Sequence, residues 1–395
     1  MTLGIYIQVP FCQTKCTYCN FHTGVVSRDR YQPYADAICR EIETEGRGFN
    51  PAVSPAKDNG ASAPEANAAL VDTAYFGGGT PSLLDPAALA RILSSLHSTF
   101  EFSADPEITL EADPETITAE KSSAWLAAGF NRISLGVQSF SDAELIAAGR
   151  MHRCADVYQA AKILRAAGLD NISMDLIAGL PHQTHATWEQ SVTELLALRP
   201  EHISIYMLEI DEGSRLGRES LAGGARYSAG KIPADDAIAD FYESACARLA
   251  AAGYDHFEIS NWALPGRRSR HNLKYWRREP YLGLGAGAHS FDGATRWANV
   301  HDSARYVAAI EQGISPREQI EPVTPAQALE EELFLGLRQL EGVDLARIER
   351  DYGVSLAQRI APLRSRGLVE LEGSRLRLAP NRLTISNEVF VELLG

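Results

Sequence analysis

Residues 4–21 read GIYIQVPFCQTKCTYCNF, an apolar run followed at once by three closely spaced cysteines. The run 4–9 is rich in apolar and aromatic residues and predicts a β-strand. Cys12, Cys16 and Cys19 follow it with the spacing C-x3-C-x2-C. Thiols clustered in this way within a long chain favour a metal site over disulfides. The stretch therefore predicts a first strand that ends in a metal-binding loop.

An alternation of predicted strands and helices continues from this stretch. Further strands are expected at 72–76, 107–112, 132–138, 171–180 and 202–208, and helices at 31–45, 86–99, 119–128, in two pieces before residue 167, and at 184–198. Such alternation predicts a parallel sheet with right-handed connections. The pattern by itself fits either an open doubly wound sheet or an incomplete barrel.

Glycines, acids and amides follow the predicted strands. The segment 77–80 comes after one strand, and Glu111, Gln138 and Asp175 lie at or near the ends of the next three. In parallel α/β folds the ligand crevice lies at the carboxyl ends of the strands. We therefore expect these residues to line one site.

We expect three parts: a core at 1–235 with a flexible insertion at about 48–70, an extension of the core at 236–320, and a C-terminal domain at 321–395. The last part has an amphipathic helix, two shorter helices and a hairpin signal at Gly373-Ser374, which predicts a winged-helix-like α+β domain. From Val323 onward, nine basic residues face eleven acidic ones, and the whole chain carries a net charge of -14. We expect no nucleic-acid binding.

The number and spacing of the cysteines limit which metal site the loop can form. A structural zinc site usually has four protein ligands, and no second C-x2-C pair or H-x3-H pair lies nearby. A catalytic zinc with three cysteines stays open as an alternative. A [4Fe–4S] cluster held by three cysteines leaves one iron without a protein ligand, and that iron can bind a substrate.

The cysteine spacing after a first strand resembles the radical S-adenosylmethionine (SAM) superfamily, and GGGTP at 77–81 is similar to its glycine-rich segment. The resemblance implies a [4Fe–4S] cluster on Cys12, Cys16 and Cys19, with SAM bound to the open iron. It also implies that the reduced cluster can cleave SAM to a 5′-deoxyadenosyl radical. The glycines suit this role because backbone must approach the ligand closely.

Longer segments, among them YFGGGTPS, EITLEADPETI, GFNRISLGVQSF and LGLGAGAHSF, resemble the oxygen-independent coproporphyrinogen III oxidase group. The resemblance implies an incomplete (β/α)6 TIM-like barrel with a C-terminal accessory domain. It places SAM contacts at Tyr6, Tyr18, Gly78, Gly79, Thr80, Glu111, Gln138, Arg150 and Asp175.

Two branches of this group differ in the residues next to the three cysteines. The oxidases carry a fourth cysteine in C-x3-C-x2-C-x-C and an N-terminal arm, whereas this chain has Phe21 at that position and only eleven residues before Cys12. The HemW-type heme chaperones resemble the sequence better, since they have C-x3-C-x2-C-x-F and H-N-x-x-Y-W. The second motif corresponds here to His271, Asn272, Tyr275 and Trp276.

The segment RRSRHNLKYWRR, 267–278, also suits heme on chemical grounds. It holds six basic residues and no acid. Its imidazole can ligate heme iron, its arginines can pair with propionates, and its aromatic rings can lie against the macrocycle. The segment therefore predicts a heme site on His271, Asn272, Tyr275 and Trp276.

The preferred hypothesis is a cytoplasmic heme chaperone that transfers heme to apo-hemoproteins. It would bind the cluster and SAM and would need a reductant for the cluster. The alternative is a radical SAM coproporphyrinogen III oxidase, in which the arginines would grip substrate propionates. Another radical reaction on a small substrate is a third possibility. The radical SAM core is expected to be intact, coproporphyrinogen oxidase activity is not expected, and no apolar run is long enough for a membrane span.

Overall fold

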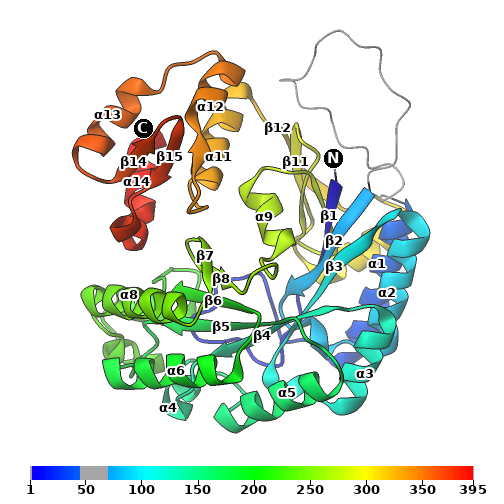
Figure 1. Cartoon of the computed structure of the whole chain (residues 1–395). Coiled ribbons are helices and arrows are strands. Elements are labelled where there is room, and N and C mark those ends of the chain that lie inside the picture. Colours follow the sequence, from blue (N-terminus) through cyan, green and yellow to red (C-terminus); the bar gives the residue numbers. More distant parts are fainter. Residues whose placement is uncertain (1, 45–69, 395) are drawn as a thin grey trace, which may run out of the picture.

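A computed structural model describes residues 2–44 and 70–394. Its centre is a run of parallel strands that pair in chain order (Figure 1). These are β1 (Thr2–Val9), β2 (Leu70–Gly78), β3 (Phe102–Ala112), β4 (Arg132–Gln138), β5 (Ile172–Ala178) and β6 (His202–Met207). The strand predictions are confirmed. Because the order of these six strands never reverses, the core is not a doubly wound sheet.

The helices of the core lie on the outer side of the curved sheet (Figure 1). They are α1 (Tyr31–Thr44), α2 (Pro86–Thr99), α3 (Ala119–Ala128), α4 (Asp142–Ala147), α5 (Cys154–Ala166) and α6 (His185–Leu198). Polar side chains fix where several begin, since Asp85 accepts from the Ala87 amide and Thr184 from the Thr187 amide. Their apolar faces and the strands share one core.

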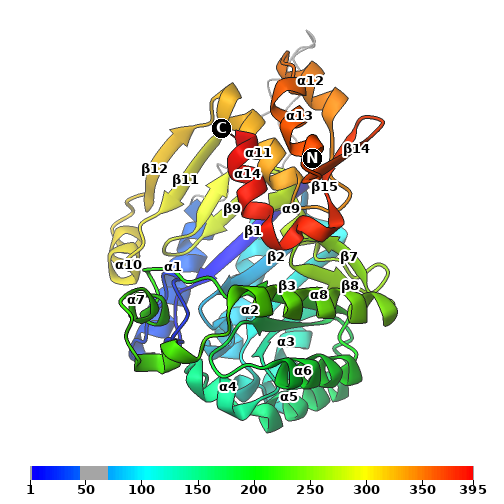
Figure 2. The ribbon, with the colours of Figure 1, turned by 90° about the vertical axis from the view of Figure 1, so that its left-hand side faces the viewer.

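The barrel is incomplete because β1 and β6 pair with other strands instead of each other. In the region between the core and the C-terminal helices the chain forms α7 (Arg215–Leu221), α8 (Asp235–Ala251), β7 (Asp255–Glu258), β8 (Asn261–Ala263), α9 (Arg270–Trp276), β9 (Tyr281–Leu284), β10 (His289–Phe291), β11 (Thr295–Asn299), α10 (Ser303–Glu311) and β12 (Arg317–Pro322). β8 pairs antiparallel with β6, and β9 pairs parallel with β1 (Figure 2). The sequence did not predict these short strands.

The C-terminal residues form a separate small sheet packed with helices. Their elements are α11 (Pro325–Gly336), β13 (Val343–Asp344), α12 (Leu345–Tyr352), α13 (Ala357–Ser365), β14 (Val369–Glu372), β15 (Arg375–Leu378) and α14 (Ser386–Leu394). The three predicted helices and the hairpin are confirmed, and α14 is an addition. The hairpin turns at Gly373, whose φ of 60° favours glycine.

Backbone contacts join this C-terminal part to the β7–β8 hairpin. The Ile259 amide donates to the Arg338 carbonyl at 3.0 Å, and the Leu340 amide donates to the Phe257 carbonyl at 3.1 Å. The predicted domain boundaries at 235 and 320 stay predictions. The predicted insertion at about 48–70 lies outside the described residues, except for Leu70, which begins β2.

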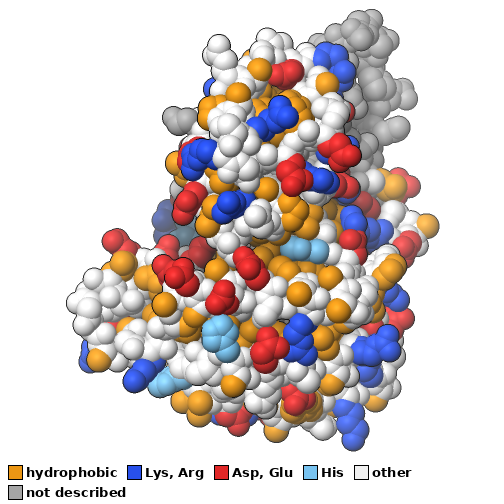
Figure 3. Space-filling view, turned by 60° about the vertical axis from the view of Figure 1, so that its left-hand side comes forward, with side chains coloured by type: hydrophobic (Ala, Val, Ile, Leu, Met, Phe, Trp, Pro, Cys, Tyr) orange, Lys and Arg blue, Asp and Glu red, His pale blue; other side chains and the backbone are white. Residues whose placement is uncertain are grey.

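The surface carries mixed charge. On the face in Figure 3, basic and acidic side chains alternate and no broad basic area is present. Within residues 2–44 and 70–394, every helix is too short or too polar to cross a bilayer.

Candidate functional site

The cysteine loop follows the carboxyl end of β1 and is fixed by backbone hydrogen bonds. The Cys12 amide donates to the Gly24 carbonyl at 3.0 Å, which closes the loop on itself. Thr17 attaches it to two other elements, because its amide donates to Ala148 at 2.9 Å and its carbonyl accepts from Leu216 at 2.8 Å. The three thiols are therefore carried by a loop anchored at both ends and in the middle, with each cysteine partly exposed.

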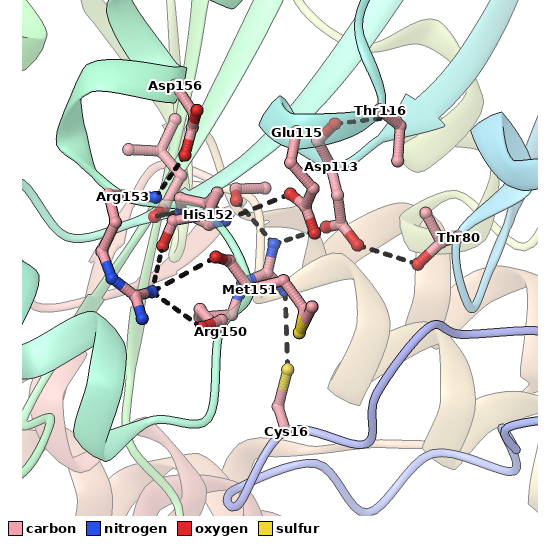
Figure 4. A network of polar contacts seen from close by, with 12 residues as sticks. Cys16, Thr80, Asp113, Glu115, Thr116, Arg150, Met151, His152, Arg153 and Asp156 are labelled. Carbon is pink, nitrogen blue, oxygen red and sulfur yellow. Dashed lines mark hydrogen bonds and ion pairs between the residues drawn. The ribbon is translucent and has the colours of Figure 1, made fainter.

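Polar groups surround these thiols. Arg150 Nη1 lies 3.6 Å from Cys16 Sγ (Figure 4). Thr23 Oγ1 lies 4.0 Å from Cys19 Sγ. Burial raises the pKa of the Cys12 thiol to about 11. Cys12 therefore stays protonated near neutral pH unless a bound cation stabilises its thiolate.

Arg150 is the centre of a network that joins the loop to the strand ends (Figure 4). Its guanidinium pairs with Asp113 and donates to the Gly136 carbonyl at 2.9 Å. Asp113 also accepts from Thr80 Oγ1 at 2.9 Å. Burial alone would lower the pKa of Arg150, but Asp113 and nearby anions raise it, so the charge is kept.

Asp113 is a residue that the sequence reasoning missed. Its signal was available, since it comes two residues after Glu111 at the end of a predicted strand. In parallel folds such a position faces the ligand crevice.

The glycine segment lies directly against the cysteine loop. A Cβ on Gly79 would lie 2.5 Å from the Phe11 carbonyl oxygen and 2.9 Å from the Phe11 nitrogen, so only glycine fits. Gly78 has a φ of 109°, and its amide donates to Glu111 Oε2 at 3.0 Å. The close packing explains why this turn needs consecutive glycines.

Glu111 and two tyrosines form the next layer. Tyr75 donates its hydroxyl to Glu111 Oε1 at 2.8 Å, and the Tyr6 ring stacks on Tyr75 at 6.0 Å. Burial raises the pKa of Glu111 to about 7, while the hydrogen bonds from Tyr75 and Gly78 oppose the rise. A carboxylate held in this way is an acceptor for hydroxyl or ammonium groups.

A polar cavity of about 50 Å³ lies inside the barrel beside Glu111. It is lined by Tyr75, Glu111, Arg132, Ser134, Ser173, Asp175, His202, Ser204, Tyr206, Ser269 and Asn272. Asp175 Oδ1 and His202 Nε2 are buried there without a hydrogen-bond partner among the described residues. Burial raises the pKa of Asp175 to about 6.

The remaining SAM candidates lie near the network. Gln138 ends β4 with a φ of 69°, and its side chain and that of Arg150 both approach Gly136. Tyr18 packs against Ala148 and neighbouring apolar residues, and burial raises its pKa. The structure thus brings Gly78, Gly79, Thr80, Glu111, Gln138, Arg150 and Tyr18 to the cysteine side of the barrel, with Tyr6 and Asp175 deeper inside.

The predicted heme segment lies at the opposite, amino-terminal opening of the barrel. The His271 amide donates to Glu107 at 3.0 Å, near the start of the paired part of β3. The His271 ring is fully buried, with Nδ1 at 2.8 Å from Thr73 Oγ1 and Nε2 at 2.9 Å from Tyr275 Oη. Burial lowers the pKa of His271 to about 3.

This geometry differs from the open iron ligand expected from the sequence. Both ring nitrogens of His271 are engaged, so neither offers a free lone pair to a heme iron. Asn272 lines the internal cavity, whereas the Trp276 ring faces Arg338 of the C-terminal part, with the guanidinium 4.7 Å from its centroid. In this conformation the motif does not form one open heme site.

The basic side chains of the segment are mostly neutralised within the protein. Their ion pairs are Arg267 with Asp170, Arg268 with Asp255, Arg270 with Asp105, Lys274 with Asp72 and Glu279, and Arg278 with Glu331. Arg277 instead donates to the Gln339 side chain at 3.4 Å. The expected propionate contacts would therefore have to compete with these carboxylates.

Comparisons with known proteins agree with the barrel and its C-terminal part. The family model of the radical SAM superfamily matches residues 6–195, and that of the HemN C-terminal domain matches residues 323–381. The heme chaperone HemW of Bacillus subtilis is 34% identical over 396 residues, covering 99% of this chain and 98% of that protein. The heme chaperone HemW of Synechocystis is 35% identical and covers 97% of this chain and 90% of that protein. The chain belongs to the HemW family.

A solved structure adds support for the fold of this HemW family member. Coproporphyrinogen III oxidase (HemN) from Escherichia coli matches with a TM-score of 0.80 at 22% identity, covering 99% of this chain and 90% of that one. The incomplete barrel with a C-terminal accessory domain is therefore confirmed.

The residues of this HemW family member fit the cofactors that a radical SAM core implies. Among the described residues, no three His, Cys, Asp or Glu side chains converge to hold a single metal ion. In an iron–sulfur cluster each thiolate binds its own iron, so three thiols on one loop need not converge. The orphaned Asp175 Oδ1 and the glycine turn, where a Cβ has no room, suit a polar ligand close to the backbone.

Proposed function

We propose that this protein is a heme chaperone, which binds heme and transfers it to apo-hemoproteins. The single observation that carries the proposal is its 34% identity to a heme chaperone over 99% of the chain and 98% of that relative. The coproporphyrinogen III oxidase alternative rests on a likeness at 22% identity, which bears on the fold alone.

We assign the cofactors to the cysteine side of the barrel. Cys12, Cys16 and Cys19 would hold a [4Fe–4S] cluster, and the arginine near Cys16 would offset the charge of a thiolate there. When bound, the cluster and SAM supply redox chemistry through the open iron, with electrons from a reductant. Gly78, by its amide, helps hold the Glu111 carboxylate where it can accept from SAM hydroxyl or ammonium groups.

The other SAM candidates act by position in this proposal. Gly79 and Thr80 keep the glycine turn against the cysteine loop, and Asp175 offers an unpartnered oxygen inside the barrel. Tyr6, Tyr18, Gln138 and Arg150 complete the proposed set. We also propose a cytoplasmic location, which the free thiols of all six cysteines favour.

The proposal is tested with the anaerobically reconstituted full chain. In an optical titration we expect hemin to bind with saturation, and the heme-loaded protein, separated from free hemin, to convert apomyoglobin to its holo form. A protein that binds no hemin would contradict the proposal. Formation of a vinyl product from coproporphyrinogen III, SAM and dithionite would favour the oxidase instead.

A further inference from the structure

Arg150 has the one cationic side chain that is found, among the described residues, to donate to a cysteine of the loop. Its Nη1 lies 3.6 Å from Cys16 Sγ, whereas Cys19 Sγ lies 4.0 Å from the neutral hydroxyl of Thr23. Hydrogen bonds to the sulfurs and nearby charge help to set the reduction potential of an iron–sulfur cluster. Arg150 is therefore placed to act on the electron affinity of a cluster held by this loop.

The end of α4 holds Arg150 against the cysteine loop. Thr17 donates its amide to the Ala148 carbonyl at 2.9 Å and its hydroxyl to the Ala147 carbonyl at 3.2 Å. Gly149 has a φ of 75°, and a Cβ there would lie 3.3 Å from Thr17 Cγ2. The backbone that carries Arg150 is thus fixed to the middle of the loop, as a preorganised contact needs.

Three acceptors share the guanidinium of Arg150. Nη1 is directed to Cys16, while Nη2 pairs with Asp113 and donates to the Gly136 carbonyl at 2.9 Å (Figure 4). Asp113 is held in turn by Thr80, whose hydroxyl donates to Asp113 Oδ2 at 2.9 Å. A planar guanidinium has its donors in fixed directions, so the acceptors that hold Nη2 also set where Nη1 points.

The positive charge of Arg150 is kept although its side chain is only 10% exposed. Burial would lower its pKa, but Asp113 and other nearby anions raise the pKa of Arg150 above its ordinary value. A buried positive charge favours a cluster that has gained an electron, because Coulomb interactions are stronger away from water. The carboxylate of Asp113 acts in the opposite direction and offsets part of this effect.

A second arginine of the same network lacks the contact with a sulfur. Arg153 donates through Nη1 to the carbonyls of Arg150, Met151 and His152 at 3.0, 3.3 and 2.7 Å. Its guanidinium lies away from Cys16 (Figure 4). Arg153 therefore provides the same charge in the same network without a hydrogen bond to the loop, which makes it a matched comparison.

We propose that Arg150 raises the reduction potential of the cluster through its hydrogen bond to Cys16, and that Asp113 is the positioning residue that directs the guanidinium and limits the rise. The inference rests on the proposed assignment of the cluster to Cys12, Cys16 and Cys19. Reduction transfers one electron from an external low-potential donor to the bound cluster, and no bond forms or breaks. The network thereby sets how strong a reductant the protein needs.

The experiment measures the midpoint potential of the cluster in anaerobically reconstituted full-chain proteins, by dithionite titration followed with electron paramagnetic resonance. Each protein is titrated without SAM and again with SAM, after its iron and sulfide content has been determined. The variants are R150Q, D113N and the control R153Q. R150K is used as well, because lysine keeps the charge but cannot serve three acceptors in fixed directions.

Without SAM, we expect R150Q to be reduced about tenfold less readily, which is a fall of about 59 mV in the midpoint of a one-electron couple. R150K should shift the midpoint in the same direction. D113N should raise the midpoint, because it removes the opposing negative charge while its side-chain oxygen still accepts from the guanidinium. R153Q should keep the wild-type midpoint.

An unchanged midpoint in R150Q would overturn the inference, even if that variant holds less iron, because a purely structural role changes cluster content and not the potential. Equal falls in R150Q and R153Q would assign the effect to net charge, and a shift that needs SAM would assign Arg150 to SAM alone; both results would also overturn it. If neither Arg150 variant retains a cluster, D113N decides, and a midpoint that does not rise overturns the inference. A wild-type protein without a cluster would instead overturn the proposed cofactor assignment.

Discussion

The two openings of the barrel differ in what their polar groups do. At the carboxyl ends of the strands, the cysteine thiols lie beside carboxylates and glycine amides, and deeper in the barrel Asp175 Oδ1 has no hydrogen-bond partner among the described residues. At the amino ends, α9 closes the barrel, and His271 has partners at both ring nitrogens. A ligand binds more strongly to buried polar groups that lack a hydrogen-bond partner. Buried groups that already have hydrogen-bond partners stabilise the fold. Chemistry is therefore expected at the first opening and structural support at the second.

The largest expected effect comes from the cysteines. Each of C12A, C16A and C19A should reduce bound iron and acid-labile sulfide to near background, because no other described thiol lies on the loop to replace the lost ligand. The measurement is iron and sulfide per chain after anaerobic reconstitution. C246A is the control, since Cys246 lies on α8. A full iron and sulfide content in the three variants would contradict the assignment of the cluster to the cysteine loop.

The second effect concerns stability at the other end. H271A should lower the free energy of unfolding by about 2–4 kcal/mol, because it leaves a cavity and removes partners from the Thr73 and Tyr275 hydroxyls. Urea unfolding followed by circular dichroism measures the change. The control H185A, at an exposed position of α6, should change it by less than about 0.5 kcal/mol. Equal stabilities of H271A and wild type would mean that α9 is not a structural plug.

A smaller effect is expected from the glycine turn. G79A should lower stability by about 1–3 kcal/mol and weaken cluster retention, because the new Cβ would meet the Phe11 backbone. G24A is a matched control in the same loop, where a Cβ has nothing within 4 Å. Urea unfolding and iron content after gel filtration measure both effects. If the two alanine variants behave alike, close packing at Gly79 is not what fixes the loop.

The last effect depends on pH. Burial raises the pKa of Glu111 to about 7 from its ordinary 4.5, so the folded state resists ionisation that the unfolded state allows. Between these pH values the wild type should lose stability relative to E111Q as pH rises, by up to about 3 kcal/mol. Below 4.5 the carboxyl is protonated in both states, and above 7 the loss is complete. Urea midpoints of both proteins across this range measure the difference, and a constant difference would contradict it.

The sequence predicted the core more fully than the extension. The long runs at 107–112 and 132–138 gave correct strands because apolar residues and turn signals agree there. The strands β7 to β12 were not predicted, since they span only three to six residues and depend on pairing with distant partners. Pairing of this kind leaves little local pattern to detect.

The same division applies to the candidate site. Cys12, Cys16 and the 77–80 segment could be named from spacing, because a metal-binding loop and a glycine turn need fixed residues at fixed positions. Asp113 was missed although it follows a predicted strand, because only folding brings it to its partner Arg150, which is 37 residues away in sequence.

The sequence by itself determined the barrel strands, the cysteine loop and the membership of a heme-chaperone family, because these depend on local patterns and on similarity along the whole chain. Only the tertiary structure decided which histidines are free. His271 lies in a basic, aromatic segment, yet folding buries its ring against Thr73 and Tyr275. His22 lies far from His301 in sequence, yet folding brings their ring centroids to 4.4 Å from each other. Availability to a ligand follows from burial and hydrogen bonding, which long-range packing sets.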